Sequence, residues 1–169
     1  MANMRIYLIG MMGSGKSTVA QALGEALNLK TIDLDSYIEE ESGHAINDIF
    51  KLLGENWFRC MERESLMNLS RTCPSFVMAT GGGTPCYYDN MKHMQKSGIT
   101  IYLNLDAENL IERADTTHRP LIQDDRIGHK LFVDMLEKRK AIYNQAQMVV
   151  YVNKPVEKIV KEIISNVLS

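Results

Sequence analysis

An α/β fold with a mainly parallel sheet is expected from three features of the sequence. Residues 6–9 form an unbroken apolar run, which is typical of a strand buried on both faces. A glycine-rich turn follows, and after it apolar residues recur on one helical stripe at Val19, Ala22, Leu23, Ala26 and Leu27. The same alternation of strand and helix continues to the end of the chain. We therefore expect a three-layer α/β/α sandwich with a five-stranded parallel sheet, and ligands bound beyond the carboxyl ends of the strands.

The remaining elements follow from the same patterns. Four further strands are expected at 31–34, 76–79, 99–105 and 148–152. Helices are expected at 46–53 and 55–69, separated at Gly54 as a C-cap, and then at 107–114 and 127–146. The last helix has Pro155 in its first turn and a single apolar stripe at Val156, Ile159, Val160, Ile163, Ile164 and Val167. Residues 115–125, DTTHRPLIQDD, have no clear period, and the length of this stretch favours a mobile lid.

Composition limits the class of protein. A length of 169 residues with 45% apolar content favours one domain, 1–169. The net charge of -2 provides no basic field, so we expect neither nucleic acid nor a membrane surface as a partner. The three cysteines, Cys60, Cys73 and Cys86, show no CxxC or Cys/His pairing, which argues against a disulfide framework or structural zinc. We expect reduced thiols, a cytoplasmic location and a monomer.

The stretch GMMGSGKST at 10–18 carries the clearest chemistry. It fits the pattern G-x-x-x-x-G-K-[ST] without a mismatch, and it lies between an expected strand and an expected helix. Backbone N–H groups in such a loop converge on phosphate oxygens, and the helix N-terminus adds about half a positive charge. We expect nucleotide phosphates at Gly13, Ser14, Gly15, Lys16, Ser17 and Thr18, with Lys16 spanning the β- and γ-phosphates and Ser17 binding Mg²⁺. The alternative is a glycine-rich turn that binds nothing.

Three other segments suggest how a second substrate is held. Asp33 and Asp35, in DLD, come at the end of the second strand and can diverge toward a metal and a substrate, although a helix cap at Asp35 is an alternative. Arg59 in GENWFRCME is either a ligand or a surface arginine. TGGGTP at 80–85 is either a turn before a helix or backbone packed against a ligand.

Taken together, the ordered set GMMGSGKST, DLD, GENWFR, TGGGTP, RPL and EKR...Y resembles the shikimate kinase family over essentially the full chain. The resemblance implies a P-loop fold like that of nucleoside monophosphate kinases, with the phosphate loop at 10–18, a substrate-binding region at about 35–62 and the lid at about 115–125. It also implies transfer of the γ-phosphoryl group of ATP to the 3-hydroxyl of shikimate, a step toward chorismate and the aromatic amino acids.

The resemblance assigns roles to particular residues. Asp35 contacts the hydroxyl groups of shikimate and is the candidate base, while Asp33 and Ser17 belong to the Mg²⁺ site. Arg59 and Arg139 match arginines that bind the carboxylate. The glycines Gly81, Gly82 and Gly83 line the ring and hydroxyls, and Arg113 matches an arginine near adenine. Arg119 matches a lid arginine that closes on the phosphates, so Lys16, Asp35 and Arg119 are the expected catalytic residues.

Two other functions remain open at this point. One is a different small-molecule kinase of the same fold, of the gluconate or nucleotide type. That reading gives no reason for Arg59, the three glycines and Arg139 to occur together. The other is a module that binds nucleotide without catalysis. An acceptor-dependent assay separates both from a shikimate kinase.

Overall fold

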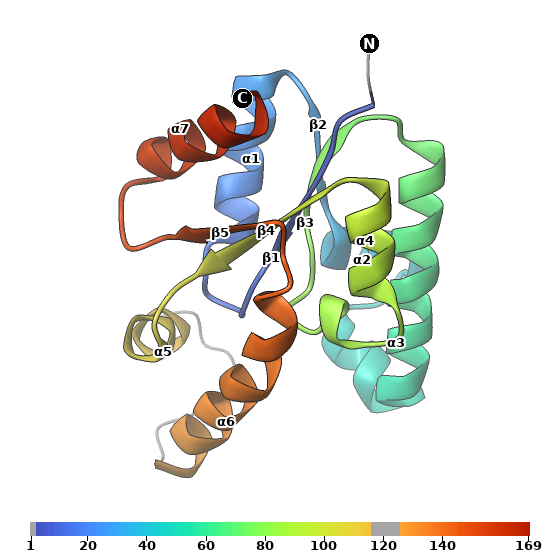
Figure 1. Ribbon diagram of the computed structural model, residues 1–169. Helices are drawn as coiled ribbons and strands as arrows, with labels where there is room; N and C mark the ends of the chain where they lie inside the picture. Colours follow the sequence, from blue (N-terminus) through green and yellow to red (C-terminus); the bar gives the residue numbers. More distant parts are fainter. Residues whose placement is uncertain (1–2, 116–125) are drawn as a thin grey trace.

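The computed structural model describes residues 3–115 and 126–169 (Figure 1). The elements in chain order are β1 (Arg5–Ile9), α1 (Lys16–Leu27), β2 (Lys30–Asp33), α2 (Leu34–Ser42), α3 (Ile46–Thr72), β3 (Phe76–Ala79), η1 (Thr84–Cys86), α4 (Asn90–Ser97), β4 (Ile99–Asn104), α5 (Ala107–Asp115), α6 (Arg126–Tyr143), β5 (Met148–Tyr151) and α7 (Val156–Val167). The predicted lid lies, except for its first residue, outside the described residues.

Within the described chain the strands form one five-stranded sheet in the order β2-β3-β1-β4-β5, and every pair is parallel. The predicted fold class is therefore confirmed. The register pairs Leu8 and Asp33 with Ala79, and it pairs Asn104 with Tyr151. All five strands thus end at one edge of the sheet, and the segments that follow them meet there.

Helices cover both faces of the sheet. Figure 1 shows α1 and α7 on one face, and α3 and α4 on the other, while α5 and α6 lie beyond the carboxyl edge. The central strands β1, β3 and β4 lie at the centre of the core, because their side chains are enclosed from both sides. The edge strand β5 is less covered, and Val149 and Tyr151 are exposed on it.

The structure corrects several element boundaries. The second strand ends at Asp33, and α2 begins at Leu34, where the sequence had predicted that the strand continues. The helices α2 and α4 and the short helix η1 were not predicted. Pro155 is the N-cap of α7 and so precedes its first turn. The strand and helix ends at 99–105, 127–146 and 148–152 each differ by one to three residues from those predicted.

The predicted break at Gly54 is confirmed. Gly54 lies inside α3 with φ 83° and ψ 168°, so two helical segments meet there at a kink. A left-handed φ is accessible to glycine without the steric cost of a Cβ atom. Among the helices of the described chain, none combines the length and apolar character needed to cross a membrane.

Candidate active site

The phosphate loop (residues 10–18) turns the chain from β1 into α1. Gly13 and Gly15 have φ values of 82° and 87°, in the left-handed region that suits glycine. At Gly10, a Cβ atom would lie 2.7 Å from the carbonyl oxygen of Leu103 in β4. Glycine is therefore required at these positions by backbone conformation and by the closeness of a neighbouring strand.

Lys16 places its ammonium group within this loop. Its Nζ atom donates hydrogen bonds to the carbonyl oxygens of Gly10 and Met11, each at 2.9 Å, and the residue is only 8% exposed. The N-cap of α1 is Gly15, whose lack of a side chain leaves the first N–H groups of the helix without a side-chain cap. A buried cation and a helix N-terminus thus coincide, which is an arrangement that attracts phosphate.

Ser17 and Asp33 lie side by side at the start of α1 and the end of β2. The hydroxyl of Ser17 donates to Oδ2 of Asp33 at 2.6 Å, and Oδ1 of Asp33 accepts from the backbone N–H of Ser36 at 3.2 Å. Asp33 is therefore the N-cap of α2, so the cap that the sequence suggested at Asp35 lies two residues earlier. A hydroxyl and a carboxylate oxygen this close are hard oxygen ligands of the kind that Mg²⁺ prefers.

Asp35 lies in the first turn of α2 and is half-buried. Its Oδ1 atom is 3.1 Å from the position that a Cβ atom on Gly81 would occupy. Because the helix begins between the two aspartates, Asp33 turns toward Ser17 while Asp35 turns toward residue 81. The predicted divergence of the two carboxylates at the strand end is therefore what the structure shows.

The glycine segment (residues 80–85) follows β3 and leads into η1. Each of its three glycines is approached by a different side chain. A Cβ atom at Gly81 would lie 2.9 Å from Oε1 of Glu62. One at Gly82 would lie 3.2 Å from Nη1 of Arg139, and one at Gly83 would lie 2.6 Å from Nη2 of Arg59. The segment is a turn that leads into η1, and its backbone packs directly against charged groups. Its contact with a ligand stays a prediction.

Arg59 is buried, at 8% exposure, so the alternative of a surface arginine is wrong. Its Nη1 atom donates to Oε2 of Glu62 at 3.0 Å, and Glu62 is fully buried. Oε1 of Glu62 in turn accepts from the hydroxyl of Thr84 at 2.6 Å. Burial opposes the charge on Arg59, but Glu62, together with Tyr87 and Glu55, outweighs that effect and raises the pKa of the guanidinium above its ordinary value.

Two more residues hold Arg59. Nε and Nη2 of Arg59 both donate to Oε1 of Glu55, each at 3.2 Å, and the ring of Tyr87 lies 4.0 Å from the guanidinium carbon. The hydroxyl of Tyr87 donates to the same Oε1 atom at 2.8 Å. This hydrogen bond from Tyr87, together with Arg59, lowers the pKa of Glu55 despite the opposing effect of burial.

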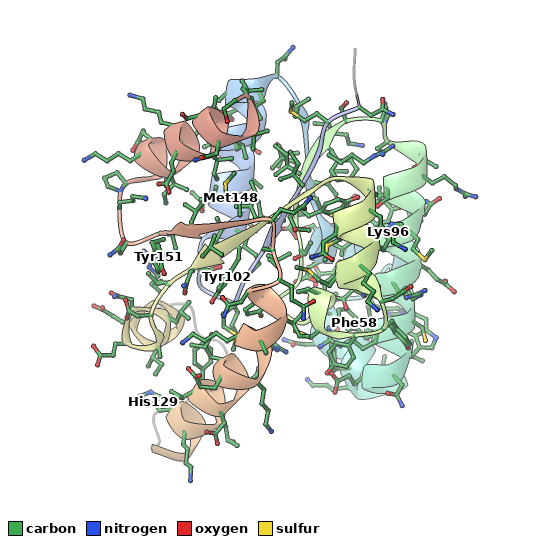
Figure 2. All side chains as sticks on the ribbon, viewed as in Figure 1. Phe58, Lys96, Tyr102, His129, Met148 and Tyr151 are labelled. Atoms are coloured by element: carbon green, nitrogen blue, oxygen red, sulfur yellow. The ribbon has the colours of Figure 1, made fainter. Side chains whose placement is uncertain are left out.

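Arg139 reaches the site from α6. Its Nη1 atom lies 3.7 Å from the sulfur of Met11 in the phosphate loop, in addition to its approach to Gly82. One turn later, the hydroxyl of the buried Tyr143 donates to the carbonyl oxygen of Gly82 at 2.5 Å. Figure 2 shows Tyr102 near the end of α6, and its ring centroid lies 5.0 Å from that of Tyr143 with the ring planes tilted by 36°.

Of the two remaining arginines, the structure describes Arg113 but not Arg119. Arg113, on α5, donates from Nη1 to the carbonyl oxygen of Gly13 at 3.5 Å, so it lies against the phosphate loop and is exposed. Arg119 lies outside the described residues, and its role stays a prediction. Thr18 is exposed in the first turn of α1.

Sequence reasoning missed four residues of this site: Glu55, Glu62, Thr84 and Tyr87. The two glutamates precede and follow Arg59 by four and three residues, which is the helical spacing of ion pairs, so that signal was present in GENWFRCME. Thr84 and Tyr87 meet α3 only through the tertiary fold. Cys60, which also lies in GENWFRCME, is exposed, and its sulfur lies 3.1 Å from the hydroxyl oxygen of Tyr88.

The arrangement joins two sets of groups along one edge of the sheet. At Gly82, the missing Cβ atom would lie 3.4 Å from the backbone nitrogen of Met12 and 3.2 Å from Arg139. The phosphate loop and the glycine segment are therefore in contact, with Arg59 and Asp35 approaching the neighbouring glycines. Such a site can hold a phosphate chain on one side and an anionic, hydroxylated molecule on the other.

Comparison with known proteins agrees with this geometry. The model of the shikimate kinase family matches residues 12–168. The shikimate kinase of Azobacteroides pseudotrichonymphae genomovar. CFP2 is 43% identical over 154 residues, which cover 89% of this chain and 91% of that protein.

Solved structures agree as well. The shikimate kinase from Bacteroides thetaiotaomicron has a TM-score of 0.90 at 34% identity, covering 98% of this chain and 99% of that one. The shikimate kinase from Acinetobacter baumannii, solved in complex with shikimate, has a TM-score of 0.89 at 32% identity, covering 97% and 92%. The fold, the paired phosphate and acceptor groups, and these likenesses lead to one conclusion: the chain belongs to the shikimate kinase family.

Proposed function

We propose that the chain transfers the γ-phosphoryl group of ATP to the 3-hydroxyl of shikimate, giving shikimate 3-phosphate and ADP. The observation that carries the proposal is the contact at Gly82, where the phosphate loop, the glycine segment and Arg139 meet. A phosphoryl donor and an acceptor must lie this close for in-line transfer, and the relative from Acinetobacter baumannii is known with shikimate bound.

On the donor side, the phosphate loop would bind the triphosphate of ATP. Lys16 would exchange its two carbonyl partners for β- and γ-phosphate oxygens and offset the charge that spreads over the transferred group. Ser17 and Asp33 would hold Mg²⁺, which neutralises phosphate charge when bound. Arg113 would lie beside the nucleotide, since it contacts the loop at Gly13. Arg119 would add positive charge from the lid.

On the acceptor side, each polar group of shikimate has a partner of matching chemistry. The carboxylate would bind the guanidinium groups of Arg59 and Arg139, because a planar fork of N–H donors suits two carboxylate oxygens. The ring and hydroxyls would lie along the glycines, where the absence of side chains allows close approach. Asp35, beside Gly81, would accept the proton that leaves the 3-hydroxyl as the new O–P bond forms.

Because all these groups come from one chain, we propose a monomeric enzyme. We also propose that it acts in the cytoplasm and that its substrates are small molecules. No partner subunit is needed to complete the acceptor side: Asp35, Arg59 and Arg139 all approach the same glycine segment. Sedimentation or light scattering of the purified chain tests the oligomeric state.

An ADP-release assay tests the reaction. The purified protein with ATP and Mg²⁺ is offered shikimate, gluconate, nucleoside monophosphates or buffer alone. We expect ADP release with shikimate well above the rate with every other addition. Faster release with gluconate or a nucleoside monophosphate would identify another kinase of the same fold, and equal release in all samples would indicate a nucleotide-binding module without an acceptor.

A further inference from the structure

The guanidinium of Arg59 is held by two carboxylates that differ in character. Glu62 is fully buried, and its second oxygen accepts from Thr84 at 2.6 Å, so it has a fixed position. Glu55 has a side chain that is half exposed, at 50%. One buried carboxylate already balances the single charge of Arg59, so Glu55 is not required to neutralise it.

The contact between Glu55 and Arg59 has imperfect geometry. The Nε and Nη2 atoms of Arg59 form the edge that can bind two carboxylate oxygens in parallel, but both donate to the one atom Oε1 at 3.2 Å. The same oxygen also accepts from the hydroxyl of Tyr87 at 2.8 Å. Three donors thus share one oxygen, whereas an incoming carboxylate would offer each N–H an oxygen of its own.

The backbone beside Glu55 also differs from ordinary helix. Glu55 directly follows Gly54, whose φ of 83° and ψ of 168° break α3, and a Cβ atom at Gly54 would meet nothing within 4 Å. Glu55 therefore lies in the first turn after a kink with open space beside it. Arg59, by contrast, has further contacts with Glu62, the ring of Tyr87 and the glycine segment.

From these three observations we infer that Glu55 is a displaceable counter-ion, which occupies the bidentate edge of Arg59 until the carboxylate of the acceptor replaces it. This inference rests on the proposed function and deepens it. Tyr87 is a positioning residue that holds Glu55 on that edge through its hydroxyl, while its ring supports Arg59. An acceptor without a carboxylate cannot replace Glu55, so Glu55 is a determinant of selectivity for acidic acceptors.

The test uses Glu55→Gln, which keeps the shape of the side chain and removes its charge. Binding of shikimate to the full-length protein is followed by calorimetry or by the fluorescence of Trp57, the one tryptophan of the sequence, which lies between Glu55 and Arg59. We expect shikimate to bind about two- to fivefold more tightly to the variant, which is the upper part of the range of a partly exposed ion pair. The neutral methyl ester of shikimate should bind both proteins within about twofold of each other.

Matched variants separate this effect from changes of charge or stability. Glu25→Gln removes one negative charge from an exposed position on α1, and it should leave the affinity for shikimate unchanged. Tyr87→Phe keeps the ring and removes the hydroxyl, so it should tighten binding when Glu55 is present and have no effect beside Glu55→Gln. If Tyr87 acts only through Glu55, the effects of the two substitutions must be non-additive in this way.

The outcomes are distinct. Weaker or unchanged binding of shikimate to Glu55→Gln would overturn the inference, because Glu55 would then be an anchor for Arg59. Equal tightening for shikimate and its methyl ester would overturn it too, since the effect would not concern the carboxylate. If the wild-type protein releases no ADP with shikimate, the proposed function fails, whereas an active wild type with an unchanged Glu55→Gln variant rejects only the counter-ion.

Discussion

Gly83→Ala perturbs the acceptor side of the site at a single point. The Cβ atom would lie 2.6 Å from Nη2, 2.7 Å from Nη1 and 2.8 Å from the guanidinium carbon of Arg59. Real Cβ atoms do not make contacts this short, so Arg59 must move. The backbone of Gly83 has φ -85° and ψ -16°, which alanine adopts without strain, so the whole effect arises from the clash.

The magnitude follows from what Arg59 loses when it moves. Its hydrogen bond to the buried Glu62 depends on its present position, and so does the contact with the acceptor carboxylate that we propose. A hydrogen bond to a charged group is worth about 1.5–3 kcal/mol, so we expect kcat/KM for shikimate to fall about ten- to 150-fold. Gly82→Ala is the matched control, because its Cβ atom would meet Nη1 of Arg139 at 3.2 Å, a contact that a small shift of that side chain relieves.

The assay is ADP release with shikimate varied at saturating ATP, accompanied by thermal unfolding to verify that each variant is folded. We expect a large rise in KM for shikimate with Gly83→Ala, a rise of less than about fivefold with Gly82→Ala, and little change in KM for ATP with Gly83→Ala. If Gly83→Ala keeps the wild-type KM for shikimate, Arg59 does not bind the acceptor from the position described here.

Three further predictions concern other parts of the site and the core. Asp35→Asn should lower kcat by at least about a hundredfold while ATP binding, measured by calorimetry, is retained; near-normal turnover would exclude Asp35 as the base. Arg59→Ala should raise KM for shikimate and also lower the free energy of unfolding by about 3 kcal/mol in urea titrations, because the fully buried Glu62 loses its partner. Burial raises the pKa of Tyr102 in the folded protein to about 12. As the pH rises, Tyr102 therefore ionises in the unfolded chain before it ionises in the folded one. The stability that the neutral phenol contributes is complete below pH 10 and is lost between pH 10 and pH 12. Between pH 8 and pH 11, the free energy of unfolding of Tyr102→Phe should therefore fall by about 1.4 kcal/mol less than that of the wild type. Equal falls of the two proteins in denaturant titrations would contradict this.

The phosphate loop and the strands were predictable because their signals are local. The pattern at 10–18 requires a strand before it and a helix after it, and both can be read from neighbouring residues. The strands β1, β3 and β4 are mostly apolar on both faces, which is typical of a parallel sheet covered by helices. The break in α3 was predictable for the same reason, because glycine readily adopts the backbone conformation found at Gly54.

The missed helices had weaker local signals. The helix α4, NMKHMQKS, is mostly polar and buries Met91 and Met94 only because it packs beside β4 and α3. The helix α2 begins directly at the end of β2, where Asp33 both caps it and bonds to Ser17. Because Asp33 is both the last residue of a strand and the cap of a helix, sequence spacing alone does not show that a helix begins there.

The chain order of residue types was enough to establish that a nucleotide loop, two carboxylates, a buried-strand sheet and a run of glycines occur together, because each depends on covalent neighbours. Tertiary packing determined which charged groups contact one another. Glu55 and Glu62 flank Arg59 along one helix, but it is Tyr87 and Gly83, arriving from a different segment, that bury the guanidinium and orient its edge. Such contacts join residues more than twenty positions apart, and their strength comes from the exclusion of water that only a packed structure provides.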